Sequence, residues 1–472
     1  MSSSVTKAEA AETFYHLSGP NLPPVCQGIA CFVARHLNPE RFSQAETQSP
    51  RLYCLGRCFA APACLTEHPQ PHIEIRASRG VILDRIVRGE TGPDYGALRR
   101  ALDLTSEEVL REVERSELRG RGGAGFPTGR KWRAVAQQEA HEKFVVVNAD
   151  EGDPGAYIDR VILERDPHLL LEGVRIAAYA VGARRGVIYL RKEYPEALPA
   201  LQRAVQEAGR VWPGEFAVEI VVGQGSYVCG EETALLNSIE GKRPEVRTRP
   251  PYPTARGLYQ RPTLINNVET LAAIPWIIQE GAAAYRNLGF SQSRGTKLLS
   301  LNSLFRKPGL YEVEFGITLR EVVEGLGGGL CSGPLKGLIV GGPLAGVIPP
   351  ELLDTRLGFE ELREIGAGVG HGGVVAFDDR TSILELAHHV FSFGAYESCG
   401  KCTPCRLGSP RVEQVFALAR QAETPSQGAY REFGAIVAAL HQASLCGHGT
   451  GLAAFAMSAM RYYRKELEAC LG

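Results

Sequence analysis

Apolar and polar positions follow two different periods along the middle of the chain. Short runs rich in β-branched residues, such as KFVVVNADE and FAVEIVVG, alternate with longer stretches whose apolar residues have helical spacing, such as PHLLLEGVRIAAYAVGA and ALPALQRAVQEAG. Strands that alternate with helices favour a parallel sheet covered by helices on its faces. This part of the chain therefore predicts an α/β fold.

A helical pattern precedes the first of these strands. The stretch TSEEVLREVERSEL predicts a helix capped by Thr105 or Ser106, with Glu107 and Glu108 in its first turn. The glycine-rich stretch RGRGGAGFPTG follows this helix directly. A loop between two helices is therefore expected there.

The same patterns divide the chain into four predicted domains. Residues 1–75 are rich in Pro and Cys, and 76–294 carry the α/β pattern. The proline-rich crossing KRPEVRTRPPYPTARGLYQRP lies before a shorter mixed stretch, 295–375, which predicts a small α+β domain. Residues 376–472 have helical spacing throughout and predict a helical bundle.

Composition narrows the choice of partners. The chain has 472 residues, a formal net charge of −1 and 44% hydrophobic residues, which gives no electrostatic reason to expect nucleic acid or a membrane surface. The start, MSSSVTKAEAAETFYHL, lacks the regions of a signal peptide, and the apolar runs are too short to span a membrane. We expect a cytoplasmic protein, whose 12 cysteines are better explained as ligands or catalytic groups than as disulfides.

Three cysteines share one short segment, ESCGKCTPCRLG. Cys399, Cys402 and Cys405 are spaced like the opening of a bacterial ferredoxin run, which indicates a [4Fe–4S] cluster rather than zinc. That run would continue to a Cys-Pro pair, but here Ser409 precedes Pro410. The fourth thiolate must therefore come from elsewhere.

The fourth ligand has four candidates, Cys229, Cys331, Cys446 and Cys470. We choose Cys446 because it lies in SLCGHGTG, at the end of a predicted helix. A glycine-rich break there lets backbone amides approach the sulfurs of a cluster.

A second group of cysteines lies near the start of the chain. Cys26 and Cys31 form one pair, and Cys54 and Cys58 form another, which is enough for a [2Fe–2S] cluster although not in the plant ferredoxin order. A zinc site, or a unit that has lost its cofactor, would explain the same spacing.

The glycine-rich loop suits a phosphate. Gly120, Gly122 and Gly125 have G-x-G-x-x-G spacing, but a helix precedes them where the dinucleotide fingerprint requires a strand, and no Walker motif is present. Backbone amides of such a loop can cradle phosphates together with nearby cations. The flanking cations are Arg119, Arg121, Arg130, Lys131 and Arg133.

Polar residues follow several predicted strands or begin predicted helices. Ligands of open α/β sheets bind beyond the carboxyl ends of strands, where such groups can hydrogen-bond a flavin edge or a ribose. Ordinary turns and helix caps would also explain each of them alone. They are Asn148, Asp150, Glu151, Glu231, Glu232, Asn266, Asn267 and Thr270.

Six motifs in this order resemble one family. LRGRGGAGFPTGRKW, NADEGDPGAYIDR, YVCGEETALLNSIEGKR, NNVETLA, ESCGKCTPCRLG and SLCG are similar to the NADH-binding flavoprotein subunit of complex I. That family includes the diaphorase subunits of soluble NAD-dependent formate dehydrogenases and NAD-reducing hydrogenases. The resemblance runs from about Tyr95 to the C-terminus. It implies a Rossmann-like domain for FMN and NADH, a ubiquitin-like (SLBB-type) domain over 295–375, and a helical bundle with a [4Fe–4S] cluster.

The resemblance also implies roles for single residues. NADH would lie over the flavin, with Phe126 near the adenine and with Glu151 and Glu232 near its ribose or nicotinamide. The cluster ligands would be Cys399, Cys402, Cys405 and Cys446. FMN would be surrounded by Gly120, Arg121, Gly122, Gly123, Gly125, Lys131, Asn148, Asp150, Tyr227, Glu231, Asn266, Asn267 and Thr270.

The first 75 residues resemble a different protein. VCQGIAC and LYCLGRCFAAPAC match the two cysteine pairs of a thioredoxin-like [2Fe–2S] subunit, without its leading helices. In complex I that subunit is normally a separate chain. The fusion favours a soluble multi-subunit enzyme, with a [2Fe–2S] subunit and a catalytic formate dehydrogenase or hydrogenase subunit as partners.

The expected activity is NADH:acceptor oxidoreduction. Hydride passes directly between cofactors, so no catalytic acid or base is required, and Glu151 is expected to bind ribose and repel the extra phosphate of NADPH. The alternatives are a complex I subunit and a non-catalytic iron–sulfur scaffold.

Overall fold

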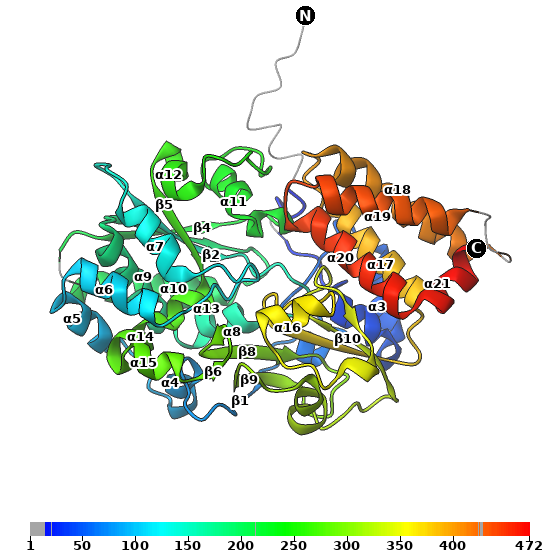
Figure 1. Ribbon diagram of the computed structural model, residues 1–472, viewed down its shortest axis with the longest axis horizontal. Helices are drawn as coiled ribbons and strands as arrows, with labels where there is room; N and C mark the ends of the chain where they lie inside the picture. Colours follow the sequence, from blue (N-terminus) through cyan, green and yellow to red (C-terminus); the bar gives the residue numbers. More distant parts are fainter. Residues whose placement is uncertain (1–14, 20, 213, 423, 425–427) are drawn as a thin grey trace, which may run out of the picture.

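The structure is a computed structural model that describes residues 15–19, 21–212, 214–422, 424 and 428–472. The first fourteen residues, on which part of the signal-peptide argument rests, lie outside the described residues. Figure 1 shows the α/β part on the left, the C-terminal helices on the right and a second sheet below and between them. Within the described ranges, no helix has the length and apolar character needed to span a bilayer.

Four parallel strands form the first sheet. In the order β4-β3-β2-β5 they are Ala217–Val222, Arg185–Leu190, Phe144–Ala149 and Thr263–Asn267. β2 comes first in the chain, and the sheet grows from it to β3 and β4 on one side and then to β5 on the other. The order therefore reverses between β2 and β5, which is where open α/β sheets bind ligands.

Both faces of this sheet are buried. Val145 and Val147 of β2 pack into the main core with the helix α9 (Pro167–Val181). Phe144 and Val146 point the other way, into a smaller cluster that contains Leu235. Successive strand residues face opposite sides, so burial on both sides requires a continuous apolar run. The VVV of the sequence meets this requirement, and the predicted α/β architecture is confirmed.

Helices surround this sheet. The capping box of α6 is formed by Thr105, whose side chain accepts the Glu108 amide at 3.2 Å, so Thr105 rather than Ser106 is the cap. The helices are α4 (Leu83–Arg88), α5 (Gly96–Leu102), α6 (Ser106–Arg115), α7 (Thr128–Ala136), α8 (Ile158–Arg165), α10 (Ala197–Val211), α11 (Glu232–Ile239), α12 (Pro253–Arg256), α13 (Val268–Ala272), α14 (Ile274–Glu280) and α15 (Ala282–Arg286).

A second, mixed sheet has the order β1-β9-β8-β12-β10-β11. Its strands are His72–Ile75, Gly309–Glu314, Thr296–Leu301, Gly373–Asp378, Leu335–Val340 and Val347–Ile348. A π-helix, η5 (Glu321–Leu326), and α16 (Phe359–Glu364) connect them, and a short hairpin of β6 (Gly289–Phe290) and β7 (Ser293–Arg294) precedes them. β12 runs to residue 378, past the predicted boundary at 375, and the ubiquitin-like assignment stays a prediction.

The described part of the N-terminal segment lacks a sheet of its own. It contains α2 (Ile29–Val33), η1 (Arg35–Leu37), α3 (Pro39–Thr47) and η2 (Cys58–Ala60), with one isolated bridge between Val25 and Cys64. β1, at its end, pairs in parallel with β9. The segment thus contributes an edge strand to the second sheet, and the thioredoxin-like description stays a prediction.

The C-terminal part is helical, as its spacing predicts. α17 (Ile383–Tyr396), α18 (Thr403–Gln421), α19 (Ala429–Ala443), α20 (Gly447–Tyr462) and α21 (Arg464–Leu471) pack on one another. Phe391, Phe416 and Phe433 meet in their core with ring centroids 5.0 to 6.2 Å apart. Aromatic contacts of this kind contribute about 0.5–1.5 kcal/mol each beyond their buried area.

Candidate functional site

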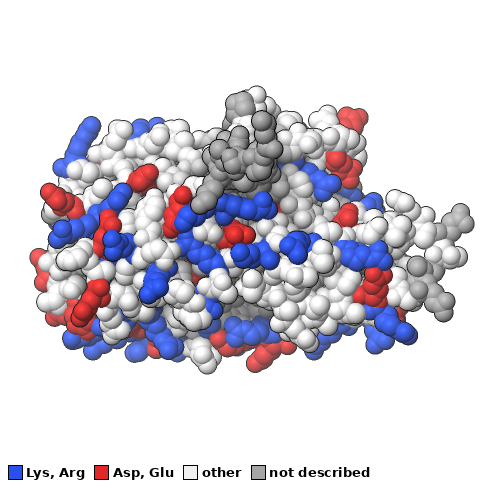
Figure 2. Space-filling view, turned by 90° about the horizontal axis from the view of Figure 1, so that it is seen from above, with Lys and Arg blue, Asp and Glu red and all other residues white. Residues whose placement is uncertain are grey.

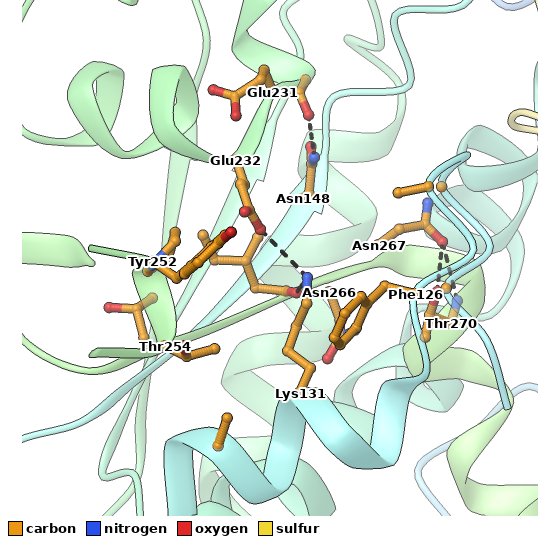
Figure 3. Close-up of a pocket in the computed structure, with 18 of the residues that line it drawn as sticks. Phe126, Lys131, Asn148, Glu231, Glu232, Tyr252, Thr254, Asn266, Asn267 and Thr270 are labelled. Carbon is orange, nitrogen blue, oxygen red and sulfur yellow. Dashed lines mark hydrogen bonds and ion pairs between the residues drawn. The ribbon is translucent and has the colours of Figure 1, made fainter. Parts of the chain in front are cut away.

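A cavity of about 650 Å³ opens at the carboxyl ends of β2 and β5, at the point where the strand order reverses. Pockets for small ligands typically measure about 300–1,000 Å³. In Figure 3 the labelled side chains come from the glycine loop, from α7, from the ends of β2 and β5, from the start of α11, from the segment at α12 and from α13. The lining residues are Gly120, Gly122, Ala124, Phe126, Arg130, Lys131, Ala134, Asn148, Gly230, Glu231, Glu232, Arg249, Tyr252, Pro253, Thr254, Thr263, Ile265, Asn266, Asn267, Thr270 and Gly447.

The polar groups at the strand ends are held in place. Trp132 Nε1 donates to Asn266 Oδ1 at 2.9 Å, and Asn148 Nδ2 donates to the Gly230 carbonyl at 2.8 Å. Lys131 Nζ lies 3.2 Å from the Ile265 carbonyl. These contacts fix a lysine and two amides around the cavity before any ligand enters.

The glycine loop is fastened to the start of α13. The Arg121 amide donates to Thr270 Oγ1 at 2.8 Å. A Cβ added at Gly122 would lie 2.9 Å from Asn267 Cβ, and one at Gly125, where φ is +60°, would lie 2.8 Å from the Phe359 ring. Glycine is therefore required at both positions, because the loop is pressed against its neighbours.

Ten of the sixteen predicted cofactor residues line the cavity: Gly120, Gly122, Phe126, Lys131, Asn148, Glu231, Glu232, Asn266, Asn267 and Thr270. Arg121, Gly123, Gly125, Asp150, Glu151 and Tyr227 do not. The prediction that Arg121 serves as a phosphate cation needs correction. Its guanidinium is buried and donates to Tyr285 Oη and to the Arg294 carbonyl, each at 2.7 Å.

Glu151 also needs a correction. Its carboxylate is fully buried and accepts hydrogen bonds from the Ile158 amide at 2.7 Å and from Tyr194 Oη at 3.0 Å. Burial raises its pKa to about 7. The side chain faces α8 rather than the cavity, so the structure gives no support to the predicted contact of Glu151 with a nucleotide ribose.

Asp150 lies directly beneath the cavity wall. Its backbone carbonyl and its carboxylate approach Gly230, which lines the cavity, and its Oδ2 has no hydrogen-bond partner among the described residues. Burial raises the pKa of Asp150 to about 8. An unpartnered buried carboxyl oxygen beside a cavity fits a ligand that supplies a hydroxyl donor.

One wall of the cavity comes from the proline-rich segment that was predicted to be a crossing between domains. Arg249, Tyr252 and Thr254 line the cavity, and Arg249 Nη1 lies 3.1 Å from Glu232 Oε1. The proline-rich segment therefore belongs to the site and leads directly into β5. The sequence clue to these cavity residues was an Arg, a Tyr and a Thr among prolines, and ordinary proline-rich turns have the same composition.

Basic side chains gather outside the cavity. In Figure 2, Lys and Arg side chains lie in a row across the middle of the face that it shows, with some Asp and Glu side chains among them. A local concentration of one charge attracts ligands of the opposite charge even when the net charge is close to zero. This face favours anionic ligands although the whole chain carries only −1.

Cys399, Cys402, Cys405 and Cys446 lie at two helix starts that face each other. Cys402 is the N-cap of α18, Cys405 lies in its first turn, and Cys446 is the N-cap of α20. Cys399 and Cys446 belong to one apolar cluster, and a Cβ added to Gly449 in α20 would lie 3.4 Å from Cys405 Cβ. Free amides at helix starts favour thiolate and sulfide charge.

The cavity and this cysteine group are neighbours. Gly447, the residue after Cys446, lines the cavity. Glu231, which also lines the cavity, lies close enough to Cys446 to raise the pKa of its thiol, although burial is the larger cause. A group bound in the cavity would therefore lie next to a group bound by these cysteines.

The N-terminal cysteines also converge. Cys26, Cys31, Cys54 and Cys58 are all buried, and the Sγ atoms of Cys54 and Cys58 are 3.3 Å apart. Backbone amides of Gly28, Gly56 and Ala63 approach the sulfurs of Cys26, Cys54 and Cys31 at 3.3 to 3.4 Å. Amide donors around buried sulfurs are the outer contacts that iron–sulfur centres use.

Among the residues that the structure describes, no group of three or more His, Cys, Asp and Glu side chains is arranged to hold a metal ion. The thiolates of an iron–sulfur cluster bind several iron atoms rather than one ion. The cysteine groups above are therefore compared with clusters and not with a single-ion site.

Comparison with known proteins matches both halves of the site. Residues 113–276 match the Nuo51 FMN-binding domain, and residues 385–470 match the iron–sulfur binding region of NADH-ubiquinone oxidoreductase F. An NADH-quinone oxidoreductase subunit of Rhizobium meliloti is 43% identical over 391 residues, 80% of this chain and 93% of the relative. NADP-reducing hydrogenase subunit HndC of Solidesulfovibrio fructosivorans is 40% identical over 385 residues, 79% of this chain and 78% of the relative.

A solved structure covers more of the chain. An NAD+-reducing [NiFe]-hydrogenase in the H2-reduced state matches with a TM-score of 0.85 and 32% identity, over 99% of this chain and 87% of that one. Fold, cavity and cysteines together define an oxidoreductase subunit that binds FMN and an iron–sulfur cluster. The chain belongs to the family of NADH-binding flavoprotein subunits of complex I-type and NAD-reducing hydrogenase-type enzymes.

Proposed function

We propose that this chain is the NADH:acceptor (diaphorase) subunit of a cytoplasmic multi-subunit enzyme, such as an NAD-dependent formate dehydrogenase or an NAD-reducing hydrogenase. One observation carries the choice. The hydrogenase chain aligns with 99% of this chain, whereas the two curated relatives named above align with 80% and 79% of it. The alignment with the hydrogenase thus extends over the N-terminal cysteine segment. A subunit of respiratory complex I is the second candidate, favoured by the 43% identity to the NADH-quinone oxidoreductase relative.

In this proposal the cavity holds FMN and the nicotinamide nucleotide. The residues fit a mononucleotide, because a cavity of suitable volume offers a lysine and amides, and the unpartnered carboxyl oxygen of Asp150 lies behind its wall at Gly230. The glycine loop presents backbone amides to the phosphate, and Lys131 presents a positive charge to it. Asn148, Asn266 and Asn267 bind the polar edge of the flavin ring or the ribityl chain.

The chemistry needs no acid or base from the protein. FMN held by Lys131, Asn148 and Asn266 would supply the conversion between two-electron hydride transfer from NADH and one-electron transfer to a cluster. This chain positions the two nucleotides and keeps water out. Phe126, whose exposed fraction of 49% leaves its ring open at the mouth of the cavity, stacks on the adenine, and Glu232 binds ribose hydroxyls.

We assign a [4Fe–4S] cluster to Cys399, Cys402, Cys405 and Cys446, and a [2Fe–2S] cluster to Cys26, Cys31, Cys54 and Cys58. Support for the second cluster is the convergence of four buried thiols with amide donors around them. The partners would be a further [2Fe–2S] subunit and a catalytic subunit that holds molybdenum or nickel.

Anaerobic purification of the full chain tests this proposal. We expect one FMN and about six iron atoms with matching acid-labile sulfide, and a flavin absorption that NADH bleaches. A brown protein without flavin that does not react with NADH would indicate a scaffold. A purified protein that contains neither flavin nor iron would overturn the proposal. Molybdenum or nickel in copurified subunits would separate the two soluble enzymes, and copurified membrane subunits would favour complex I.

A further inference from the structure

His371 lies next to the glycine loop and between two carboxylates from the segment that follows β2. It lies between α16 and β12 of the second sheet, and the preceding Gly370 forms a bridge with Gly123 of the glycine loop. Its ring is flanked by two carboxylates. Nδ1 is 3.1 Å from Asp153 Oδ2, and Nε2 is 3.5 Å from Asp159 Oδ2.

The two carboxylates favour a ring that is protonated at both nitrogens. A neutral imidazole has one N–H and one lone pair, so it would present the lone pair to one of the carboxylates. Only the doubly protonated ring donates toward both Asp153 and Asp159. The two carboxylates raise the pKa of His371 well above its usual value, although burial opposes them.

A chain of contacts runs from this ring into the cavity. Asn267 Nδ2 donates to Asp159 Oδ2 at 2.7 Å, and it lies within hydrogen-bond distance of His371 Nε2, at 3.3 Å. Asn267 Oδ1 in turn accepts the Thr270 amide at 3.1 Å. Thr270 Oγ1 accepts the Arg121 amide of the glycine loop. The ring thus supports Asn267 and Thr270 in the cavity and, through Thr270, the glycine loop.

We propose that His371 is a positioning residue of the flavin site, whose protonated ring fixes Asp159 and Asn267 so that the affinity for FMN depends on the protonation of His371. This inference rests on the proposed FMN site. Tyr227, which was predicted to contact the cofactor, acts in the same group of residues, because its Oη donates to Asp153 Oδ1 at 2.7 Å. The loop Asp153 to Gly155 thereby connects the flavin site to the second sheet.

Other charges surround the ring. Asp150 and Glu151 lie in the same segment as Asp153, and the charge of His371 lowers the pKa of each, against the larger effect of burial. From β8, Lys297 Nζ donates to the His371 carbonyl at 2.9 Å, and Glu269 of α13 pairs with that lysine. The charge of Lys297 disfavours the protonated ring. The carboxylates of Asp150, Glu151, Asp153 and Asp159 favour it.

The sign of the pH effect follows from the raised pKa. The ring is charged in the folded protein below its pKa, and the support it gives is lost as the pH rises through that value. FMN affinity should therefore be constant near neutral pH and fall on the alkaline side. Losing a hydrogen bond to a charged group corresponds to roughly tenfold or more in affinity.

The test is FMN binding to the full chain after its flavin has been removed, followed by flavin fluorescence from about pH 6 to about pH 9. We expect His371→Gln to raise the Kd about tenfold at neutral pH and to reduce the alkaline fall, of which the ionisation of Asp150, with its pKa of about 8, leaves a part. His371→Lys, which keeps a charge, should retain more affinity. His168→Gln is the matched control, because His168 is also buried beside a carboxylate, 3.0 Å from Glu207, but lies outside the cavity.

Three results would overturn the inference: a wild-type affinity without an alkaline fall, a His371→Gln profile equal to wild type, or an equal loss in His168→Gln. If His371→Gln does not fold, the profiles of wild type and His371→Lys decide the question. A wild-type chain that binds no FMN at any pH would contradict the proposed function itself. Binding by wild type that His371→Gln leaves unchanged would contradict only this inference.

Discussion

The Glu151 carboxylate accepts the backbone amide of Ile158 at 2.7 Å and thereby fixes the start of α8. The second oxygen of the same carboxylate accepts the Arg160 amide at 3.2 Å. The first amides of a helix have no partner within the helix, so a carboxylate there satisfies them and also interacts favourably with the helix dipole. The Glu151 carboxylate is thus buried and hydrogen-bonded to the start of α8, and it does not line the cavity.

Replacing Glu151 by Gln should leave the preference for NADH over NADPH unchanged. The side chain does not reach the cavity, so its charge is not in contact with a nucleotide. Steady-state kcat/KM values for the two nucleotides test this expectation. Glu151→Ala should instead lower the free energy of unfolding by about 1–3 kcal/mol, because buried amides lose their acceptor. A tenfold change in nucleotide preference for Glu151→Gln would restore the role assigned from the sequence.

Glu232→Gln should relax the same preference. Glu232 lines the cavity, and its carboxylate lies 3.4 Å from Lys131 Nζ and 3.1 Å from Arg249 Nη1. Removing this charge frees two cations and removes a group that repels the 2′-phosphate of NADPH. We expect the ratio of kcat/KM for NADPH to that for NADH to rise about tenfold or more. Glu151→Gln is the matched control, because it removes a carboxylate outside the cavity.

The pair of Lys297 and Glu269 joins β8 of the second sheet to α13, the helix that follows β5. Both side chains are fully buried, and the Glu269 carboxylate also accepts the Leu298 amide at 3.0 Å. Breaking one partner of a buried pair leaves an uncompensated charge and costs about 3–5 kcal/mol. Lys297→Met should therefore lower the free energy of unfolding by that amount. Adding Glu269→Gln should recover part of the loss, and a double variant no more stable than the single one would argue against this account.

Iron content should distinguish the two cysteine groups. Cys54→Ala should remove about two iron atoms per chain and leave the flavin in place, whereas Cys405→Ala should remove about four. Cys64→Ala is the control, because that thiol is near the N-terminal group but only half buried and lies outside the proposed ligand set. Equal iron in wild type and Cys54→Ala would mean that the N-terminal cysteines hold no cluster.

Local chemistry explains which parts of the site could be predicted. The glycine spacing, the polar residues after β2 and β5 and the spacing of Cys399, Cys402 and Cys405 are all short-range patterns. Such patterns, with the family resemblance for Phe126, predicted ten of the cavity residues and a cysteine group with Cys446 beside it. Position in the chain also indicates the edge of the sheet at which a residue lies, because parallel strands end together.

Side-chain direction could not be predicted in the same way. Arg121 and Glu151 stand among cavity residues in the sequence, yet Arg121 turns toward Tyr285 and Glu151 toward α8. Each direction depends on a partner far along the chain or on the path of the backbone after a strand. The contribution of His371 was missed for the same reason, since its partner Asp153 is 218 residues away in the sequence.

Burial raises the pKa of Asp150 from 3.8 to about 8. The folded protein then holds a proton that the unfolded chain releases above about pH 4, so this group destabilises the folded state increasingly as the pH rises from there to about 8. One such proton corresponds to about 1.4 kcal/mol per pH unit. Asp150→Asn cannot ionise, so in the flavin-free chain its Tm should fall less steeply with pH than that of wild type, although the raised pKa of Glu172, about 7, leaves part of the slope. Thermal unfolding between about pH 5 and about pH 8 measures both slopes. Parallel slopes would mean that the Asp150 carboxylate is already ionised in the fold, and that the cavity wall supplies a charge rather than a neutral carboxyl group.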